Sequence, residues 1–422
     1  MTLFARLYIM KNDFKGRIFD TWKDQNRYSI ELCAGSAWHR FWTDNTDISN
    51  LLRRGQLVAL STTEQNEIVS LEILAVPERT EWDLSTDSGR WQKTLGGPSL
   101  RERLQQRQCI ISAIREDLYG QDFLEVETPL LVKSTCPDLH IDSIQAGEGY
   151  LVTSTEYQIK RMIVGGFERV FTLTKNFRAN DRGRYHSCEF TMLEWARAYE
   201  TLHEIEEDAI RFIRKAFRKL YPEQDKLNFE THEIDFMSQP WERLTVREAF
   251  ERYLGLSDLQ DFSLEALCLS AKKAEVVLPQ HFQQDKYLVM SYLFDLLQHH
   301  LGTHTPTFLQ EWPAYLTTSA PICKNDPTVA ERSELYVAGI EIADGFPFLR
   351  DAKKQRALFA EALQLRQEKG KLRVEIDEPF LEALGQGLPP GAGMALGVDR
   401  LVMVLTGASR LQDVQAFDWD EL

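Results

Sequence analysis

Cysteine, positive charge and long apolar runs are scarce in this sequence of 422 residues. The six cysteines lie far apart without a C-x-x-C pair, which predicts neither a zinc cluster nor a disulfide framework and favours a reducing compartment. No apolar run approaches the roughly 20 residues that span a bilayer, and a charge follows the amino terminus too early for a signal peptide. We therefore expect a cytoplasmic protein that does not engage a membrane.

Basic residues are outnumbered, with 49 Lys and Arg against 64 Asp and Glu, so the formal net charge is −15. This acidity argues against a protein that coats nucleic acid, although it is compatible with a local basic groove. Hydrophobic residues make up 43% and charged residues 27%, which is typical of a soluble globular chain. The length predicts two to three domains.

Three regions are expected along the chain. Residues 1–80 carry short strands at 57–60 and 68–74 beside several aromatic residues, which indicates a small OB-like β-barrel. The aromatic side chains either fill the core of this barrel, which is the simpler interpretation, or stack on nucleic-acid bases. Residues 81–98 are polar and end in Gly-Gly-Pro, as a linker does. Residues 99–422 are predicted to form an α+β body.

The α+β class follows from helices that are grouped between antiparallel strands instead of alternating with them. The expected helices cover residues 99–119, 201–220 and much of 245–300, with a closing helix from Asp399. The expected strands cover 123–129, most of 150–199, and segments near 306–316, 333–346 and 391–397.

A first group of residues with chemical potential lies on the hairpin that contains Arg178 and Glu194. Period-two alternation places Phe190, Met192 and Glu194 on one face. A flat ring, a carboxylate and a nearby guanidinium suit a purine stacked on Phe190 and an anion held by Arg178. The alternative is a charged hairpin that is merely solvated.

A second group lies on Glu334-Leu-Tyr-Val-Ala-Gly-Ile-Glu341. If Ala338 and Gly339 form a two-residue turn, Glu334 and Glu341 share one face of the hairpin. Two such carboxylates repel each other unless a cation lies between them, and oxygen ligands favour Mg²⁺. The alternative is a pair of exposed glutamates on a wet sheet.

A third group is a glycine-rich strand, residues 391–397, followed by an apolar helix with Arg400 in its first turn. The helix N-terminus and the guanidinium converge there on an anion. The run is not the dinucleotide fingerprint G-x-G-x-x-G. Close backbone packing is the simpler alternative for the glycines.

Together these groups predict one site, in which adenine is stacked, the phosphates are held by Arg178 and Arg400, and Mg²⁺ is held by Glu334 and Glu341. Attack of a carboxylate on the α-phosphate needs little covalent help from a protein. Charge neutralisation and alignment would supply most of the catalysis.

The same residues resemble known motifs. Phe177-Arg178 with His186-Ser-Cys-Glu-Phe-Thr-Met-Leu-Glu194 resembles motif 2 of class II aminoacyl-tRNA synthetases, 393–400 resembles motif 3, and Phe123 to Pro129 resembles motif 1. The likeness, which runs from about residue 99 to the end, is greatest to the lysyl-tRNA synthetase-like family with its elongation factor P lysyltransferases. It implies an antiparallel sheet flanked by helices, a homodimer formed through motif 1, and ATP-dependent formation of an aminoacyl adenylate.

Residue matching to the family assigns roles. It implies catalytic roles for Arg178 and Arg400, and Mg²⁺ ligands at Glu334 and Glu341. The implied ATP-binding residues are Arg178, Asn180, His186, Ser187, Phe190, Glu334, Leu335, Gly397 and Arg400. The implied amino-acid-binding residues are Ser154, Glu156, Glu194, Ala196, Glu341, Asp344, Phe348 and Ala395. Ala395 stands where lysyl-tRNA synthetases usually carry glycine. The lysyltransferases resemble this sequence in having alanine there.

Three departures from the family pattern affect the expected specificity. Asn180 replaces a carboxylate near the adenine amino group, where an amide oxygen still accepts a hydrogen bond. Ala196 and Phe348 replace a tyrosine and a glutamate that hold the substrate's terminal ammonium in the relatives. Burying an unpaired ammonium costs several kcal/mol. We therefore hypothesise an altered amino-acid specificity, with a more apolar pocket and an added carboxylate at Asp344.

The acceptor of the activated amino acid stays open at this point. The catalytic motifs and Ala395 favour transfer to a lysine of an elongation factor P-like protein. The amino-terminal barrel instead favours a compact tRNA synthetase that charges tRNA. Less favoured are a non-catalytic paralogue and transfer to a carrier protein or small molecule.

Overall fold

The computed structural model describes residues 12–25, 27–34, 37–76, 98–139, 141–417 and 419. The chain forms two compact units, Met1–Glu102 with Ala416–Leu422, and Arg103–Gln415. The linker predicted for residues 81–98 lies outside the described residues except for Pro98. Each unit is therefore treated separately.

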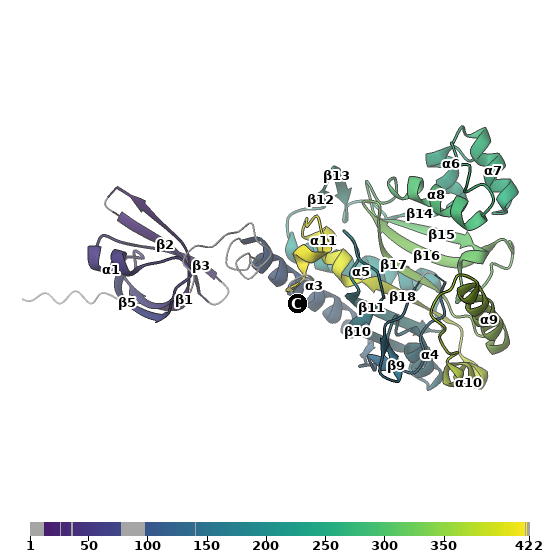
Figure 1. Ribbon diagram of the computed structural model, residues 1–422, viewed down its shortest axis with the longest axis horizontal. Helices are drawn as coiled ribbons and strands as arrows, with labels where there is room; N and C mark the ends of the chain where they lie inside the picture. The colour runs from purple at the N-terminus through teal and green to yellow at the C-terminus, as the bar shows by residue number, and fades with distance from the viewer. Residues whose placement is uncertain are drawn as a thin grey trace, which may run out of the picture. The chain divides into compact units, whose positions relative to one another are not determined.

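The first unit is a five-stranded antiparallel sheet (Figure 1). Its elements are β1 (Asn12–Asp24), β2 (Arg27–Ala34), β3 (Ala37–Thr43), α1 (Thr46–Leu51), β4 (Leu57–Thr62) and β5 (Ile68–Ala75). The strand order is β3-β2-β1-β4-β5, and a bridge between Trp42 and Glu67 links its two outer regions. A helix between the third and fourth strands and a nearly closed five-stranded sheet agree with the predicted OB-like barrel.

The aromatic residues of this unit divide between its core and its surface. Phe41 is buried with Ile30 and Val58. By contrast, Trp22 is 37% exposed, and the guanidinium of Arg27 lies 4.0 Å from the ring centroid of Trp42. The core interpretation thus holds for Phe41, whereas base stacking by the outer aromatic side chains stays a prediction.

The second unit is built on an eight-stranded sheet, antiparallel except for its outermost pair at each end. In spatial order its strands are β14 (Glu242–Thr245), β15 (Thr307–Pro313), β16 (Val329–Val337), β17 (Ile340–Pro347), β18 (Gly391–Gly397), β11 (Glu189–Ala198), β10 (Arg169–Phe177) and β6 (Leu124–Glu125). Small sheets surround it, formed by β7 (Leu131–Val132), β8 (Gln145–Ala146), β9 (Gly149–Leu151), β12 (Lys226–Phe229) and β13 (His232–Asp235).

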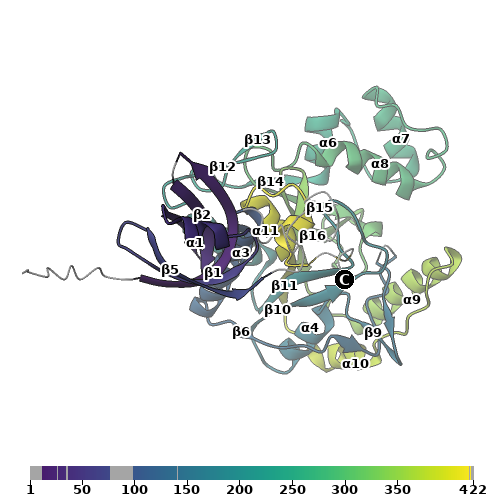
Figure 2. The same ribbon diagram turned by 60° about the vertical axis from the view of Figure 1, so that its left-hand side comes forward.

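Helices cover the two faces of this sheet unequally. One face packs against α3 (Pro98–Gly120), α5 (Leu202–Leu220) and α11 (Val398–Leu405) in the largest apolar core. The other face meets α4 (Glu156–Val164), which packs beside α10 (Glu378–Gly387) (Figure 2). The first face is sealed by apolar packing, whereas the second retains a cavity.

A separate apolar core holds the helices inserted between β14 and β15 (Figure 1). These are α6 (Val246–Leu254), α7 (Leu264–Lys273) and α8 (Lys286–Gln298). The remaining elements are α9 (Ala352–Glu368) and the 3₁₀ turns η2 (Ala314–Leu316) and η3 (Leu411–Val414). Within the described part of the chain, no helix is both long and apolar enough to cross a membrane. All six cysteines are free thiols.

Most predicted elements are confirmed, with three corrections. The strand expected over 123–129 is reduced to Leu124–Glu125. The region 150–199, expected to be mostly strand, contains the helix α4. The alternation of Tyr157 and Ile159 is typical of a strand, whereas the four-residue spacing of Ile159 and Ile163 is typical of one face of a helix. Two helices, α9 and α10, occupy a stretch in which the sequence analysis predicts no element.

The β16–β17 hairpin forms as predicted at its turn but not beyond it. Ala338 and Gly339 have φ values of 52° and 76°, as a two-residue type I′ turn requires. Beyond the turn the register shifts, so that Leu335 pairs with Ala343 and Ile342 is an extra residue in β17. This bulge changes which side chain lies opposite Glu334.

Candidate active site

A cavity of about 460 Å³ lies on the face of the large sheet that α4 partly covers. Such a volume is typical of a small-molecule site. Most of the predicted site residues line it: Ser154, Glu156, Arg178, His186, Ser187, Phe190, Glu194, Ala196, Glu341, Asp344, Phe348, Ala395, Gly397 and Arg400. The sheet thus brings together residues that are more than 200 positions apart in the chain.

Strand register explains this convergence. Glu194 of β11 pairs with Ala395 of β18, and Ala395 pairs with Asp344 of β17. Asp344 in turn pairs with Glu334 of β16, because of the bulge. The row crosses the middle of the sheet and forms the floor of the cavity.

Three predicted site residues do not line the cavity. Asn180 is exposed in the loop after β10, with a φ of 60°. Leu335 is fully buried in the core on the opposite side of the sheet, so its side chain does not face the cavity. Glu334 is buried and bound to neighbouring side chains.

Arg178 has the geometry of an anion-binding residue. It follows β10, and its guanidinium carbon lies 5.1 Å from the ring centroid of Phe190. Its Nε is buried and has no hydrogen-bond partner among the described residues. A buried, unpaired donor on a cation is unfavourable unless a ligand supplies an acceptor, and a phosphate or carboxylate would do so.

Arg400 is held in place by the protein itself. Its guanidinium donates to the backbone oxygen of Glu341 at 2.9 Å and contacts Nε2 of His186 at 2.7 Å. Burial and the charge of Arg400 lower the pKa of His186, which favours the neutral ring that accepts from the guanidinium. Arg400 therefore projects a fixed positive charge from the first turn of α11.

Glu341 and Glu334 differ in their availability to a cation. Glu341 lines the cavity with its side chain 43% exposed, and its carboxylate lies 3.4 Å from Arg400. Burial raises its pKa, but Arg400 and Arg332 outweigh burial and hold the pKa below the usual value. Glu334 instead has a pKa well above its usual value, because of its burial and the negative charge of Glu341.

At the other end of the cavity, Glu194 is a buried carboxylate with neutral partners. It accepts hydrogen bonds from the backbone N–H of Thr155 at 2.6 Å and from the hydroxyl of Ser154 at 2.9 Å. It makes no ion pair within the described part of the chain. Burial raises its pKa to about 7 despite these hydrogen bonds, so a cation placed beside it would be strongly stabilised.

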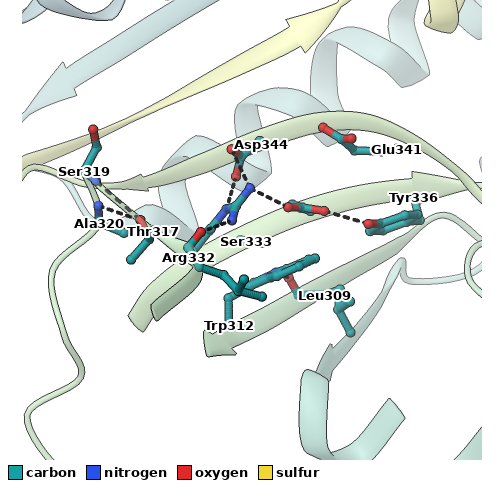
Figure 3. Close-up of polar contacts among 12 residues, drawn as sticks. Leu309, Trp312, Thr317, Ser319, Ala320, Arg332, Ser333, Tyr336, Glu341 and Asp344 are labelled. Atoms are coloured by element: carbon teal, nitrogen blue, oxygen red, sulfur yellow. Dashed lines mark hydrogen bonds and ion pairs between the residues drawn. The ribbon is translucent and has the colours of Figure 1, made fainter. Parts of the chain in front are cut away.

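Asp344, in contrast, is fully engaged by Arg332. The guanidinium makes hydrogen bonds of 2.8 and 3.1 Å to the two carboxylate oxygens (Figure 3). It also forms an ion pair with Glu334 at 2.7 Å and lies over the Trp312 ring. Glu334 in turn accepts from the Tyr336 hydroxyl at 2.6 Å. The carboxylate expected at Asp344 is present, but it is bound to an arginine.

A second internal ion pair lies on α4. The ammonium of Lys160 is 2.5 Å from the carboxylate of Glu156, one helical turn away, and the Lys160 side chain is only 3% exposed. The ammonium also lies 5.3 and 5.8 Å from the ring centroids of Phe346 and Phe348. A buried lysine thus lines the cavity beside its aromatic wall.

Ala196 and Phe348 close this end of the cavity with apolar surface. They belong to one cluster of buried side chains with Ile159, Ile163 and Leu388. Phe348 is 6% exposed and Ala196 is 2% exposed, so each is almost fully covered.

The sequence analysis missed Lys160 and Arg332. The spacing of Glu156 and Lys160 is the i, i+4 spacing of a helical ion pair, but it carries that meaning only once α4 is recognised as a helix. Arg332 lies two residues before Glu334 in one strand, so period-two alternation would have placed it on the same face.

The fold and these residues define a known class of protein. Residues 89–420 match the class II tRNA synthetases of the D, K and N group, and the chain belongs to this family. It is accordingly a ligase of the class II synthetase type, as the sequence motifs imply. Residues 1–88 lie outside the match.

Individual relatives are more specific. The chain is 35% identical to the elongation factor P–(R)-β-lysine ligase of Salmonella arizonae over 346 residues, which cover 79% of this chain and 99% of the relative. It is 34% identical to the ligase of the same name from Salmonella paratyphi B, with the same coverage. These relatives match nearly end to end.

Proposed function

We propose that this protein activates an amino acid with ATP and transfers it to a lysine side chain of an elongation factor P-like protein. The observation that carries the proposal is the cavity with Arg178 and Arg400 at one end and the buried Glu194 at the other. This arrangement suits a molecule with an ammonium at one end that meets a phosphate at the other. The names of the relatives supply the acceptor.

The first step would join the amino acid to AMP. The carboxylate oxygen attacks the α-phosphorus, the bond between that phosphorus and the bridging α–β oxygen breaks, and pyrophosphate leaves. Arg178 would align the carboxylate with the α-phosphate, Arg400 would bind the other phosphates, and Phe190 would stack on adenine. Ser154 and Glu194 would orient the amino group. No side chain has to form a covalent bond.

The second step would release AMP. The neutral Nζ of the acceptor lysine attacks the carbonyl carbon of the adenylate, an amide bond forms, the mixed anhydride bond to the phosphate oxygen breaks, and the attacking nitrogen loses a proton. Reacting through the adenylate makes AMP the leaving group, which a free carboxylate lacks.

Mg²⁺ fits this site as a partner of ATP. In proteins it commonly takes one or two carboxylates, with phosphates and water completing its octahedron. Glu341 faces the cavity, and its negative charge raises the pKa of the buried Glu334, a repulsion that a divalent cation would relieve. When bound, the ion would neutralise charge on the phosphates. Glu341 would hold it directly, whereas Glu334 would do so only after exchanging its ion pair with Arg332 for the metal.

We also propose that the protein is a cytoplasmic homodimer. Large apolar side chains are exposed near the edge strand β6 and in the segment that follows it, namely Tyr119, Leu124, Leu130, Leu131 and Phe167. A two-residue edge strand beside such apolar surface suits burial against a second copy. Size-exclusion chromatography with light scattering tests this expectation.

A tRNA synthetase is the second candidate function. It is favoured by the barrel, where guanidinium groups lie over aromatic rings: Arg27 is 4.0 Å from the centroid of the half-buried Trp42, and Arg40 is 5.9 Å from that of the exposed Trp22. Aromatic and basic side chains on one surface suit single-stranded nucleic acid. Because the ligases match this chain over 99% of their own length, the protein acceptor is our first choice.

Separate transfer reactions distinguish these functions. The full-length protein is incubated with ATP, Mg²⁺ and a mixture of radiolabelled amino acids, together with either elongation factor P or total tRNA. We expect acid-stable label on elongation factor P. Label that appears only on tRNA, and that base releases, would replace this proposal with the synthetase.

A further inference from the structure

From the pairing of charges in the cavity, we infer that this protein selects an amino acid with a single ammonium group and an uncharged side chain. The inference rests on the proposed function, because it concerns the substrate of the same activation reaction. It departs from the name of the relatives, whose β-lysine carries two ammonium groups. Four observations support it.

The first is that one carboxylate of the amino-acid end lacks a cation. Glu194 is buried at 5% exposure, and both of its described hydrogen-bond donors are neutral. Because a buried carboxylate without a cation is unfavourable, a substrate ammonium beside Glu194 would stabilise it more than it would stabilise a carboxylate that is already paired. The α- or β-amino group of the substrate supplies that ammonium.

The second observation is that the other carboxylates of this end already have cations. Glu156 is 2.5 Å from the ammonium of Lys160. Asp344 uses both oxygens on Arg332. Since each of these carboxylates is already paired with a buried or half-buried cation, it gains less from a further ammonium than Glu194 does.

The third observation is the position of Lys160. Its ammonium is almost fully buried and lies beside Phe346 and Phe348, at the wall that a substrate side chain would approach. A lysine or β-lysine substrate would bring a second ammonium toward this one. The two like charges would repel each other in a site with little water.

The fourth observation excludes an acidic side chain as well. A substrate carboxylate near Lys160 would compete with Glu156 for the same ammonium and would leave one of the two carboxylates unpaired. Only an uncharged side chain leaves both internal ion pairs intact. The apolar surface of Ala196, Ile159 and Phe348 is suited to receive it.

ATP–pyrophosphate exchange by the full-length protein tests this inference. The panel contains leucine, methionine, phenylalanine and their β-amino isomers as uncharged substrates, with lysine, (R)-β-lysine, ornithine and glutamate as charged ones. We expect the best uncharged substrate to exceed every charged one in kcat/KM by about 10- to 100-fold.

Failures of the two proposals give different results. If lysine, (R)-β-lysine, ornithine or glutamate is the best substrate, the inference is wrong and the proposed activation reaction stands. If no amino acid supports exchange, both are wrong.

A matched pair of variants tests the role of the buried lysine. Lys160→Met removes the internal ammonium and leaves Glu156 without its partner, so the ratio of kcat/KM for lysine to that for the best uncharged substrate should rise by about tenfold or more. Lys160→Arg keeps the positive charge and should retain the wild-type preference. Because the readout is a ratio within each variant, partial unfolding does not change it. An unchanged ratio in Lys160→Met would overturn the assignment.

Discussion

The two ends of the cavity differ in how their positive charges are balanced. At the ATP end, Arg178 has a buried donor with no acceptor in the described part of the chain, and Arg400 lies 3.4 Å from the partly exposed Glu341. At the amino-acid end, the cations Lys160 and Arg332 are paired with carboxylates at 2.5 to 2.8 Å. The first end is prepared for a highly charged ligand. At the second end each cation already has a carboxylate partner, and Glu194 has no cation among the described residues.

This difference separates chemistry from specificity. The groups that adenylate formation needs match the synthetase motifs, whereas the groups that contact the far end of a lysine substrate in the family pattern are Ala196 and Phe348 here. The reaction can therefore be retained while the side chain of the substrate changes. The predictions below test each end of the cavity against the other.

The largest effect is expected at the ATP end, from Arg178→Ala. Loss of a fixed guanidinium that meets the transferred phosphate should lower kcat for exchange by about 10²- to 10³-fold with every amino acid. Lys175→Ala, in the strand that precedes Arg178 and with a partly exposed side chain, should leave exchange unchanged. A protein that only binds nucleotide would show no exchange even before the substitution.

A smaller effect that depends on the substrate is expected at the amino-acid end. The double variant Ala196→Tyr with Phe348→Glu adds a hydroxyl and a carboxylate beside Lys160, so lysine should gain about tenfold in kcat/KM relative to uncharged amino acids. Phe348→Leu adds no charge and should keep the wild-type order. Equal changes for lysine and leucine would show that this wall does not determine specificity.

Glu194 should give the cavity a pH-dependent affinity for amino acids. Its pKa of about 7 means that the carboxylate is mostly protonated at pH 6 and mostly ionised at pH 8. Because only the ionised form pairs with an ammonium, KM for the amino acid should fall about tenfold over this interval. Glu194→Gln should have a higher KM that is nearly independent of pH.

The same group predicts the direction of a stability change. A raised carboxyl pKa favours the protonated form in the folded protein, so the free energy of unfolding should decrease as the pH rises from 4.5 toward 7. Urea denaturation of the wild-type protein and Glu194→Gln at pH 5 and pH 8 measures this difference. If both proteins lose the same free energy of unfolding between pH 5 and pH 8, the pH dependence comes from groups other than Glu194.

The smallest effect on activation is expected in the barrel. Trp22→Ala and Arg40→Ala change exposed side chains outside the catalytic unit, so amino-acid exchange should be unaffected. If tRNA is the acceptor, the same variants should weaken tRNA binding by about tenfold through the loss of a stacking contact. Filter binding at a stated salt concentration measures this.

Much of the fold follows from the sequence because the patterns are long and local. The helix 201–220 and the strands that carry Arg178 and Glu194 have strong periodicity, and the structure confirms them. The helix α4 was not recognised, because a nine-residue segment with two apolar residues at alternate positions fits both periods. Tertiary packing decides such short segments.

The composition of the candidate site is less accessible from the sequence than its location. Arg178, Phe190 and Arg400 belong to recognisable motifs, and the structure places all three around one cavity. Which carboxylate is paired with which cation depends on contacts between distant strands and helices. The binding of Asp344 to Arg332 is one such contact, because it requires a register shift that no sequence pattern indicates.

The extra residue in β17 has a consequence for how this site can change over time. In a regular strand, Glu341 and Asp344 are an odd number of positions apart and would point to opposite faces. The bulge at Ile342 resets the alternation, so that one strand delivers both Glu341 and Asp344 to the same cavity. Deleting this one residue would turn either Glu341 or Asp344 toward the sealed apolar core. A substitution on one side of Ile342 therefore leaves the carboxylate on the other side in place, whereas a change in the length of this strand would move one carboxylate out of the cavity.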